Sequence, residues 1–273
     1  MINKKYGQVI GVIAIKGGVG KTTIATNLAA TLAEEYQKKV LLIDGNFSAP
    51  TTHLHVGVLN PEKTIHDILQ AQSDPTQAIY SVTENLHIIP GTLEERNINP
   101  MDLHLYMKRL KERYDFIFID ASPNLNEEMI ATINAADQLF VITTPDHVAL
   151  SATLHAVKVA RKRLTYVSGI IMNMVNNKNY ELDYKTIEEI TKTPVIGIIN
   201  KDANFLKAVE KTIPYMMHNK KNTDAKVEYR KIAAAMTGTT YKDPRLIPAL
   251  KSLFKKEISK GEINRTLILK SHY

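Results

Sequence analysis

Short apolar runs alternate with amphipathic stretches along most of the chain. Runs rich in β-branched residues predict strands at residues 8–15, 40–44, 86–91, 115–120, 138–144, 167–173 and 193–199. Helix-length segments lie between them, such as 22–36 and 151–164. Strands that are apolar on both faces and alternate with helices are typical of a parallel sheet covered by helices. We therefore predict an α/β fold with a doubly wound, mostly parallel sheet.

The pattern changes near the C-terminus. Residues 227–238 predict a last helix that Gly238 closes, and we expect the compact domain to span residues 1–244. In the remaining segment, 245–273, apolar side chains recur at helical spacing, and lysines lie largely on the opposite side. Residues 245–260 therefore predict a basic amphipathic helix, a pattern suited to a membrane interface or to packing on a protein surface.

Net charge adds a preference for anionic partners. The chain of 273 residues carries a formal charge of +7. Residues 245–260 hold five basic side chains against one acidic side chain, a net of +4. Such an excess favours nucleic acid or the anionic surface of a membrane. The chain has no cysteine, which excludes disulfides, thiolate metal sites, iron–sulfur clusters and cysteine nucleophiles.

The first residues resemble a signal peptide only briefly. Two lysines precede an apolar run, residues 9–15, that is short and leads directly into a glycine-rich turn. We therefore predict a buried strand there rather than a secretion signal. No stretch approaches the ~20 apolar residues of a membrane-spanning helix, and we expect a cytoplasmic protein.

The clearest chemical motif follows this first strand, in AIKGGVGKTT, residues 14–23. Gly20, Lys21 and Thr22 fit the end of a phosphate-binding loop, but Ile15 stands where that pattern opens with glycine, and Lys16 follows it. A glycine turn between strand and helix presents backbone N–H groups to phosphate. Lys21 would reach the β- and γ-phosphates, and the Thr22 hydroxyl would bind Mg²⁺. The alternative, a purely structural turn, is disfavoured by the Gly-Lys-Thr-Thr spacing.

Two aspartates end neighbouring predicted strands. Asp44 follows the apolar run 40–43, and Asp120 ends the run 115–120 in the manner of a Walker B element. Each has a structural alternative as a turn or cap residue. Because both follow buried strands beside one phosphate loop, the metal-binding interpretation is favoured.

These segments resemble the MinD/ParA superfamily of ATPases. KGGVGKT at residues 16–22, with Lys16 in place, is similar to the deviant Walker A motif of that superfamily. The resemblance continues through LLIDGNFSAPTTHLHVGV, YDFIFIDASPNLNEE, AADQLFVITTPDHVAL, GIIMNMVNNKNYEL and TPVIGIINKD. It covers roughly residues 8–240 and is strongest to archaeal-type MinD-like proteins.

The resemblance implies a P-loop NTPase fold that binds ATP or ADP with Mg²⁺ and forms a homodimer around the nucleotides. In such proteins the first glycine of the loop is dispensable, so Ile15 is no defect. Lys16 would reach the partner's nucleotide and stabilise the charge that develops during phosphoryl transfer.

Further site residues follow from the same resemblance. The residues expected to contact phosphate are Gly17, Gly18, Val19, Gly20, Lys21, Thr22 and Thr23. Asp44 would open switch I, and Asp120 would begin switch II and hold the metal through water. The residues expected near the adenine base or the nucleotide edge of the dimer are Asn173, Asn200, Asp202, Pro145 and Asp146.

One position departs from the family pattern. Many relatives have a second aspartate two residues after the switch I aspartate, where it positions the attacking water, but this chain has Asn46. An amide orients water without charge and cannot act as a base. We expect ATP binding and dimerisation to survive this change and turnover to be slow.

The preferred functional interpretation is a MinD-like switch ATPase. ATP-dependent dimerisation would bring two copies of the segment 245–260 to an anionic membrane and would recruit an activating protein and other partners. The alternative is a ParA-like partitioning ATPase that binds DNA non-specifically, with a steep salt dependence. A metal-cluster carrier on this scaffold is disfavoured because cysteine is absent, and a ligase is disfavoured by Lys16.

Two other features favour structural interpretations. His53 and His55 resemble a metal pair, but alternate residues of an extended segment point to opposite sides. Residues 108–113, KRLKER, predict the solvated end of a helix, where cations face the negative helix terminus.

Overall fold

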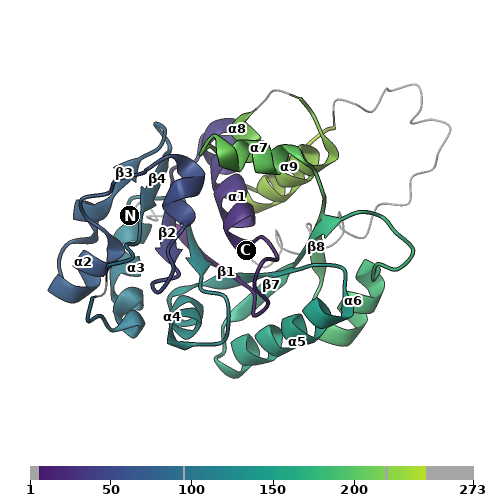
Figure 1. The fold of residues 1–273 in the computed structure, drawn as a ribbon, viewed down its shortest axis with the longest axis horizontal. Helices are drawn as coiled ribbons and strands as arrows, with labels where there is room; N and C mark the ends of the chain where they lie inside the picture. The colour runs from purple at the N-terminus through teal and green to yellow at the C-terminus, as the bar shows by residue number, and fades with distance from the viewer. Residues whose placement is uncertain (1–5, 95, 219–220, 244–273) are drawn as a thin grey trace, which may run out of the picture.

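A computed structural model describes residues 6–94, 96–218 and 221–243 (Figure 1). Its strands are β1 (Gln8–Ile13), β2 (Val40–Gly45), β3 (Tyr80–Ser81), β4 (Leu86–Ile89), β5 (Phe116–Ala121), β6 (Gln138–Thr143), β7 (Tyr166–Val175) and β8 (Val195–Asn200). They form one sheet in the order β3-β4-β2-β5-β1-β6-β7-β8. Neighbouring strands are parallel except β3 and β4. The predicted doubly wound, mostly parallel α/β fold is confirmed.

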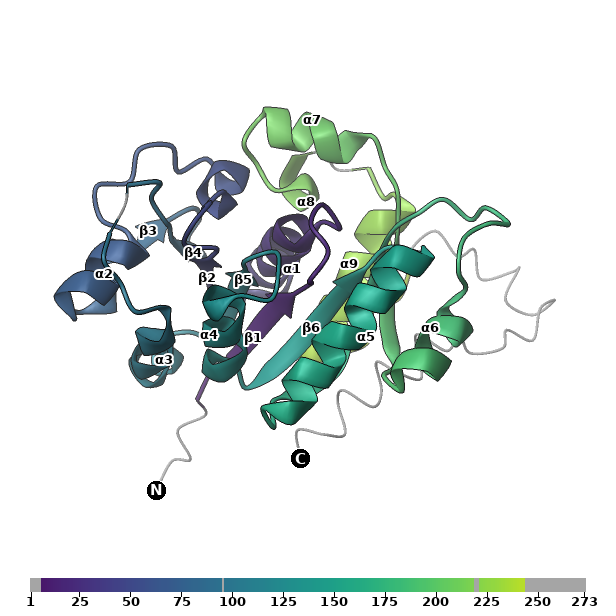
Figure 2. The same cartoon turned by 60° about the horizontal axis from the view of Figure 1, so that its bottom comes forward.

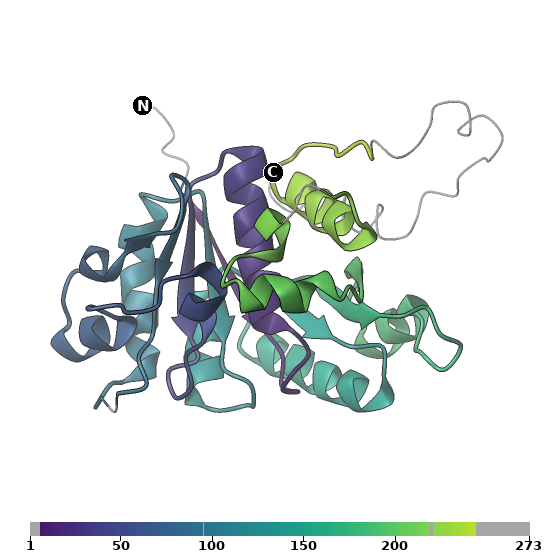
Figure 3. The ribbon, with the colours of Figure 1, turned by 45° about the horizontal axis from the view of Figure 1, so that its top comes forward.

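Helices cover both faces of the sheet (Figures 1 and 2). On one face lie α1 (Lys21–Tyr36), α7 (Asn204–Glu210), α8 (Tyr215–His218) and α9 (Asp224–Met236). On the other lie α2 (Ile65–Ala71), α3 (Leu103–Lys111), α4 (Glu127–Ala135), α5 (His147–Lys162) and α6 (Tyr184–Thr191). Short 3-10 helices are η1 (Thr52–Val56), η2 (Pro75–Ala78) and η3 (Pro100–Asp102). Figure 3 shows α1 and α9 packed side by side.

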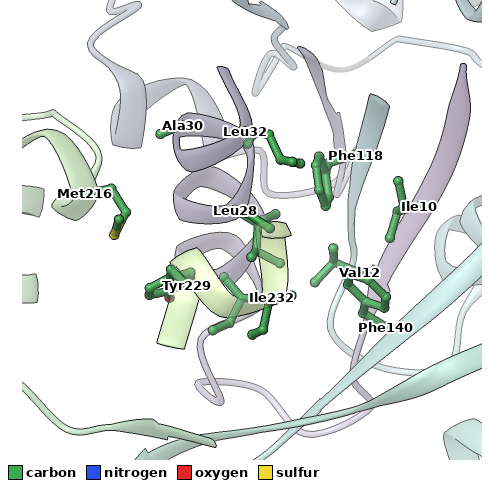
Figure 4. Close-up of a cluster of buried hydrophobic side chains, with 14 of the residues drawn as sticks. Ile10, Val12, Leu28, Ala30, Leu32, Phe118, Phe140, Met216, Tyr229 and Ile232 are labelled. Carbon is green, nitrogen blue, oxygen red and sulfur yellow. The ribbon is translucent and has the colours of Figure 1, made fainter. Parts of the chain in front are cut away.

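The core has two layers because successive strand side chains point to opposite faces of the sheet. In β5, Phe118 packs toward α1, whereas Ile117 and Ile119 pack toward α2 and α3. Figure 4 shows Leu28 of α1 and Ile232 of α9 in the first of these layers. These side chains are fully buried. Packing on both faces therefore holds the central strands in place, and it positions the loops that follow their carboxyl ends.

All seven predicted strands are present, with ends that differ by at most two residues. The sequence pattern missed β3, because two residues at an antiparallel edge leave no periodic signal. The helix predicted from residue 151 begins at His147, since the Asp146 carboxylate caps it by accepting a hydrogen bond from the Ala149 N–H. The segment around His53 and His55 was expected to be extended, and this was wrong: it forms η1.

The predicted amphipathic segment at residues 245–260 lies outside the described residues. The last described helix, α9, ends at Met236 and is followed by Gly238 with a φ of 73°, which agrees with the predicted helix end. Among the described residues, no helix has both the length and the apolar character needed to span a membrane.

Candidate nucleotide-binding site

The glycine-rich loop between β1 and α1 is open to solvent. A Cβ atom added to Gly17 or Gly18 would meet no atom within 4 Å. Gly18 and Gly20 have φ values of 74° and 93°, which glycine adopts without steric cost. No side chain caps α1 at Gly20. The N–H groups of the first helical turn and the positive end of the helix dipole therefore face the loop, as an anion site requires.

Lys21 brings a positive charge beneath this loop. The residue is 8% exposed. Burial lowers the pKa of Lys21, and the nearby Asp120 carboxylate opposes this shift. An ammonium group that has lost much of its hydration gains from an anionic ligand. Lys21 is therefore positioned to bind phosphate.

Asp44 and Asp120 lie opposite each other on the neighbouring strands β2 and β5. Both are almost completely buried. Burial raises the pKa of Asp44 to about 7, with a further contribution from the Asp120 charge, while N–H groups of Thr52 and Asn46 oppose it. Burial also raises the pKa of Asp120, and the hydroxyls of Thr22 and Thr52 and the Lys21 charge oppose this.

Thr52 joins the two carboxylates. Its N–H donates to Asp44 Oδ2 at 2.9 Å, and its hydroxyl donates to Asp120 Oδ2 at 2.9 Å. Thr52 is fully buried. Thr52 was not predicted as a site residue, because its one signal in the sequence was its position within the segment that begins at Asp44. Residues 44–52, which we call switch I, are thereby tied to the end of β5.

These residues fit a divalent cation. Asp120 Oδ1 is buried and has no hydrogen-bond partner, and carboxylate and hydroxyl oxygens are the ligands that Mg²⁺ prefers. Both oxygens of Asp44 already accept backbone N–H groups, from Asn46 and Thr52. The geometry therefore favours Thr22 and Asp120 as the residues nearest a metal. We expect Asp44 to contribute its charge from the adjacent strand.

Lys16 is held within its own chain. Its Nζ donates to both oxygens of Asp146, at 3.1 and 3.0 Å. The same carboxylate accepts the Thr144 hydroxyl at 2.6 Å and the Ala149 N–H at 2.9 Å. The predicted contact of Lys16 with a partner's nucleotide therefore requires this ion pair to open.

Known proteins are similar to this chain in sequence and fold. The model of a family described as an AAA domain matches residues 7–167. An ATP-binding protein of Methanocaldococcus jannaschii is 31% identical over 235 residues, which cover 85% of this chain and 88% of that protein. The sporulation initiation inhibitor protein Soj of Bacillus subtilis is 32% identical over 206 residues, which cover 68% and 79%. The structure of the Pyrococcus furiosus cell division ATPase MinD has a TM-score of 0.78 at 26% identity, and the match covers 83% of this chain and 97% of that one.

The chain belongs to the MinD/ParA family of P-loop ATPases. Another structural neighbour, the septum site-determining protein MinD of Pyrococcus horikoshii, was solved in complex with Mg-ADP. It has a TM-score of 0.78 at 26% identity, and the match covers 83% of this chain and 94% of that one. The roles expected for individual residues remain predictions, and the described structure shows how each residue is placed.

Asn46, the position that departs from the family pattern, lies half-buried in switch I. Its backbone N–H donates to Asp44 Oδ1 at 3.2 Å, and its side-chain Nδ2 donates to the carbonyl oxygen of Ala49. The amide therefore stabilises the turn of switch I. Its side-chain carbonyl is the group with which we expect it to orient water.

The three polar residues expected near the adenine base lie in β7, at the end of β8 and in the turn that follows β8. Asn173 of β7 donates its Nδ2 to the carbonyl oxygen of Val19 at 2.8 Å, so this MinD/ParA protein uses it to support the phosphate loop from below. Asp202 accepts the Tyr215 hydroxyl at 2.6 Å and organises the turn after β8. Asn200 ends β8. Pro145 accepts the N–H of Leu182 at 3.0 Å.

Proposed function

We propose that this MinD/ParA protein is a dimerising switch that binds and hydrolyses ATP with Mg²⁺. The Thr52 bridge is the observation that carries the proposal. One threonine of switch I holds Asp44 and Asp120 together beside Lys21 and below an open glycine loop. Two buried carboxylates and a buried ammonium are costly without ligands of opposite charge, and a phosphate with its cation supplies both charges.

The phosphate loop would bind the nucleotide through its backbone amides and Lys21. A bound Mg²⁺ ion would neutralise charge on the β- and γ-phosphates. Thr22 and Asp120 would hold it, with Asp44 adding negative charge behind them. Lys21 would stabilise the oxygens on which negative charge increases, and Asn46 would orient the attacking water. Because Asn46 cannot accept a proton, slow turnover is expected.

Nucleotide binding would change switch I through Thr52. With a cation bound at its unpaired Oδ1, the Asp120 carboxylate would hold the hydroxyl of Thr52, which donates to Oδ2, less tightly. Thr52 also carries the N–H that binds Asp44, so a shift at Asp120 moves the end of switch I. Lys16 would leave Asp146 and complete the site of a second subunit.

Dimerisation would present two copies of the basic segment 245–260 to an anionic membrane, so that weak single contacts become strong paired ones. The cytoplasmic protein would thus attach peripherally in its ATP state and be released by an activating protein. A ParA-like role with DNA as the bound surface is the second candidate, supported by the similarity to a plasmid partition protein of Borrelia burgdorferi, which has a TM-score of 0.61 at 27% identity over 76% of this chain.

Sedimentation with anionic vesicles in ATP and in ADP tests the proposal. We expect co-sedimentation to increase in ATP, Leu253→Glu with Phe254→Glu to abolish this increase, and Lys21→Ala to abolish the dimers that form in ATP. Binding of double-stranded DNA that falls steeply with salt, without vesicle binding, would instead support the ParA-like role. A protein that binds no ATP in the presence of Mg²⁺ would contradict both.

A further inference from the structure

The turn after α5 holds a residue that fits its backbone conformation poorly. Leu164 has a φ of 61°. Its N–H donates to the Arg161 carbonyl at 3.0 Å, and the Thr165 N–H donates to the Ala160 carbonyl at 3.1 Å. These are the two hydrogen bonds of a Schellman motif, in which the left-handed position is usually glycine. A bulky side chain at this position is sterically disfavoured, so the turn itself does not account for leucine.

Packing within the chain does not account for leucine either. Leu164 is 94% exposed, the largest value among the large apolar side chains of the described residues. Tyr166, two residues further along, is 52% exposed. Leu164 and Tyr166 line a surface hollow together with Arg161 and Lys192. Exposure of a single apolar side chain is ordinary, but exposure together with a strained backbone points to a contact outside the chain.

Basic residues lie near this leucine: Arg161 and Lys192 line the same hollow, and Lys162 and Arg163 precede it in the chain. Arg161 Nη2 donates to the Lys192 carbonyl at 2.8 Å and to Thr193 Oγ1 at 3.0 Å, which joins the turn after α6 to the turn after α5. Lys162, Arg163 and Lys192 are exposed, and within residues 6–94, 96–218 and 221–243 no ion pair engages them. Cations are expected at any helix C-terminus, so the combination with Leu164 is the informative feature.

We propose that this face docks on an anionic lipid bilayer. The Leu164 face comprises Arg161, Lys162, Arg163, Leu164, Tyr166 and Lys192. An exposed aliphatic side chain beside basic residues complements a surface with anionic headgroups and an apolar interior, and tyrosine is favoured at that boundary. DNA offers the anionic charge but no apolar layer for leucine. The segment 245–260 is basic, as the Leu164 face is, so charge repulsion disfavours this segment as the partner that covers the face.

The Leu164 face lies at the far end of the sheet from the phosphate loop. Because β6 and β7 are parallel neighbours, α5 runs back to the edge at which the strands begin (Figure 2). The turn that follows α5 is therefore remote from the nucleotide. This contact does not depend on dimerisation, so it is independent of the proposed ATP switch.

The test uses the full-length chain without nucleotide and in ADP. Co-sedimentation is measured with vesicles of phosphatidylcholine, with and without 30% phosphatidylglycerol. Leu164→Gly is the main variant, because glycine fits the left-handed position and the variant should fold at least as stably. Leu206→Ala on α7, 77% exposed in the wild type, is the matched control. Each is also made with Leu253→Glu and Phe254→Glu to remove the contribution of the segment 245–260.

We expect Leu164→Gly to weaken partitioning onto the anionic vesicles at least threefold, with an equal or higher melting temperature, while Leu206→Ala changes neither. Lys162→Glu with Arg163→Glu should remove the preference for phosphatidylglycerol. Equal partitioning of wild type and Leu164→Gly in both backgrounds would overturn the proposal. So would a defect of Leu164→Gly that is confined to binding of double-stranded DNA or of another protein.

Discussion

Replacing Asp44 with asparagine should stabilise the protein when nucleotide and metal are absent. The Asp44 carboxyl group is buried beside Asp120, and its pKa rises from 3.8 to about 7. One pKa unit corresponds to about 1.4 kcal/mol. At pH 8 the ionised Asp44 in the folded state therefore lowers the free energy of unfolding by about 4 kcal/mol. The substitution would remove this cost because an amide stays neutral.

Asparagine loses part of that gain in hydrogen bonding. Asp44 accepts N–H groups from both Asn46 and Thr52, and an amide has one carbonyl oxygen and one NH₂ group. One backbone N–H would lose its acceptor, at a cost of about 1–3 kcal/mol. At pH 8 the variant should remain more stable than the wild type by about 1–3 kcal/mol.

The pH dependence gives the sharper test. A carboxyl group whose folded pKa lies above its unfolded pKa favours folding fully below pH ~3.8, and this stability is lost as the pH rises to about 7. The advantage of Asp44→Asn should therefore grow by about 2–3 kcal/mol between pH 5 and pH 8. The hydrogen-bonding cost does not titrate, so it cancels in this comparison.

Urea denaturation with EDTA at pH 5, 6.5 and 8 measures this difference. Asp115→Asn, at an exposed aspartate just before β5, is the matched control. If the difference in the free energy of unfolding between Asp44→Asn and the wild type is the same at pH 5 and pH 8, Asp44 is not a buried carboxylate with a raised pKa. The same variant should hydrolyse ATP more slowly than the wild type, so that stability and activity change in opposite directions.

Three further substitutions address the loop, the switch and the ion pair. Gly20→Ala places a Cβ 2.3 Å from Asn173 Nδ2 at a φ of 93°, and isothermal titration should show ATP affinity reduced at least tenfold. Thr52→Val removes the hydroxyl that donates to Asp120 but keeps the backbone N–H that donates to Asp44. Urea unfolding should show that the free energy of unfolding falls by about 1–2 kcal/mol, and steady-state assays should show a lower kcat. An unchanged kcat would show that Thr52 has no part in the switch. Asp146→Asn keeps the helix cap but weakens the ion pair with Lys16. Sedimentation velocity in ATP should therefore detect dimers at a lower protein concentration than for the wild type. The free energy of unfolding should change by less than ~1 kcal/mol, because the ion pair is partly exposed.

The local sequence pattern determined most of the architecture. Apolar runs of strand length and intervening helical segments report burial directly, because side-chain periodicity depends only on neighbouring residues. The phosphate loop was also readable, since glycine, lysine and threonine at fixed spacing form one continuous turn. Asp44 and Asp120 were found because each ends an apolar strand.

Contacts between distant residues needed the tertiary structure. Lys16 and Asp146 are 130 positions apart, and Asn173 and Val19 are 154 apart. Their meeting depends on β1 and β6 being neighbours and on β7 lying next to β6. Periodicity cannot report that order, because every buried parallel strand has the same pattern.

Conformation also separated residues that look alike in the sequence. The strained turn at Leu164 has the composition of an ordinary helix end, and Thr52 is one threonine in a loop. The sequence by itself determined the sheet, its helices and the chemistry of the phosphate loop, because these follow from local periodicity and spacing. Only the tertiary structure decided which distant charges and hydroxyls meet, because strand order and helix packing set those distances.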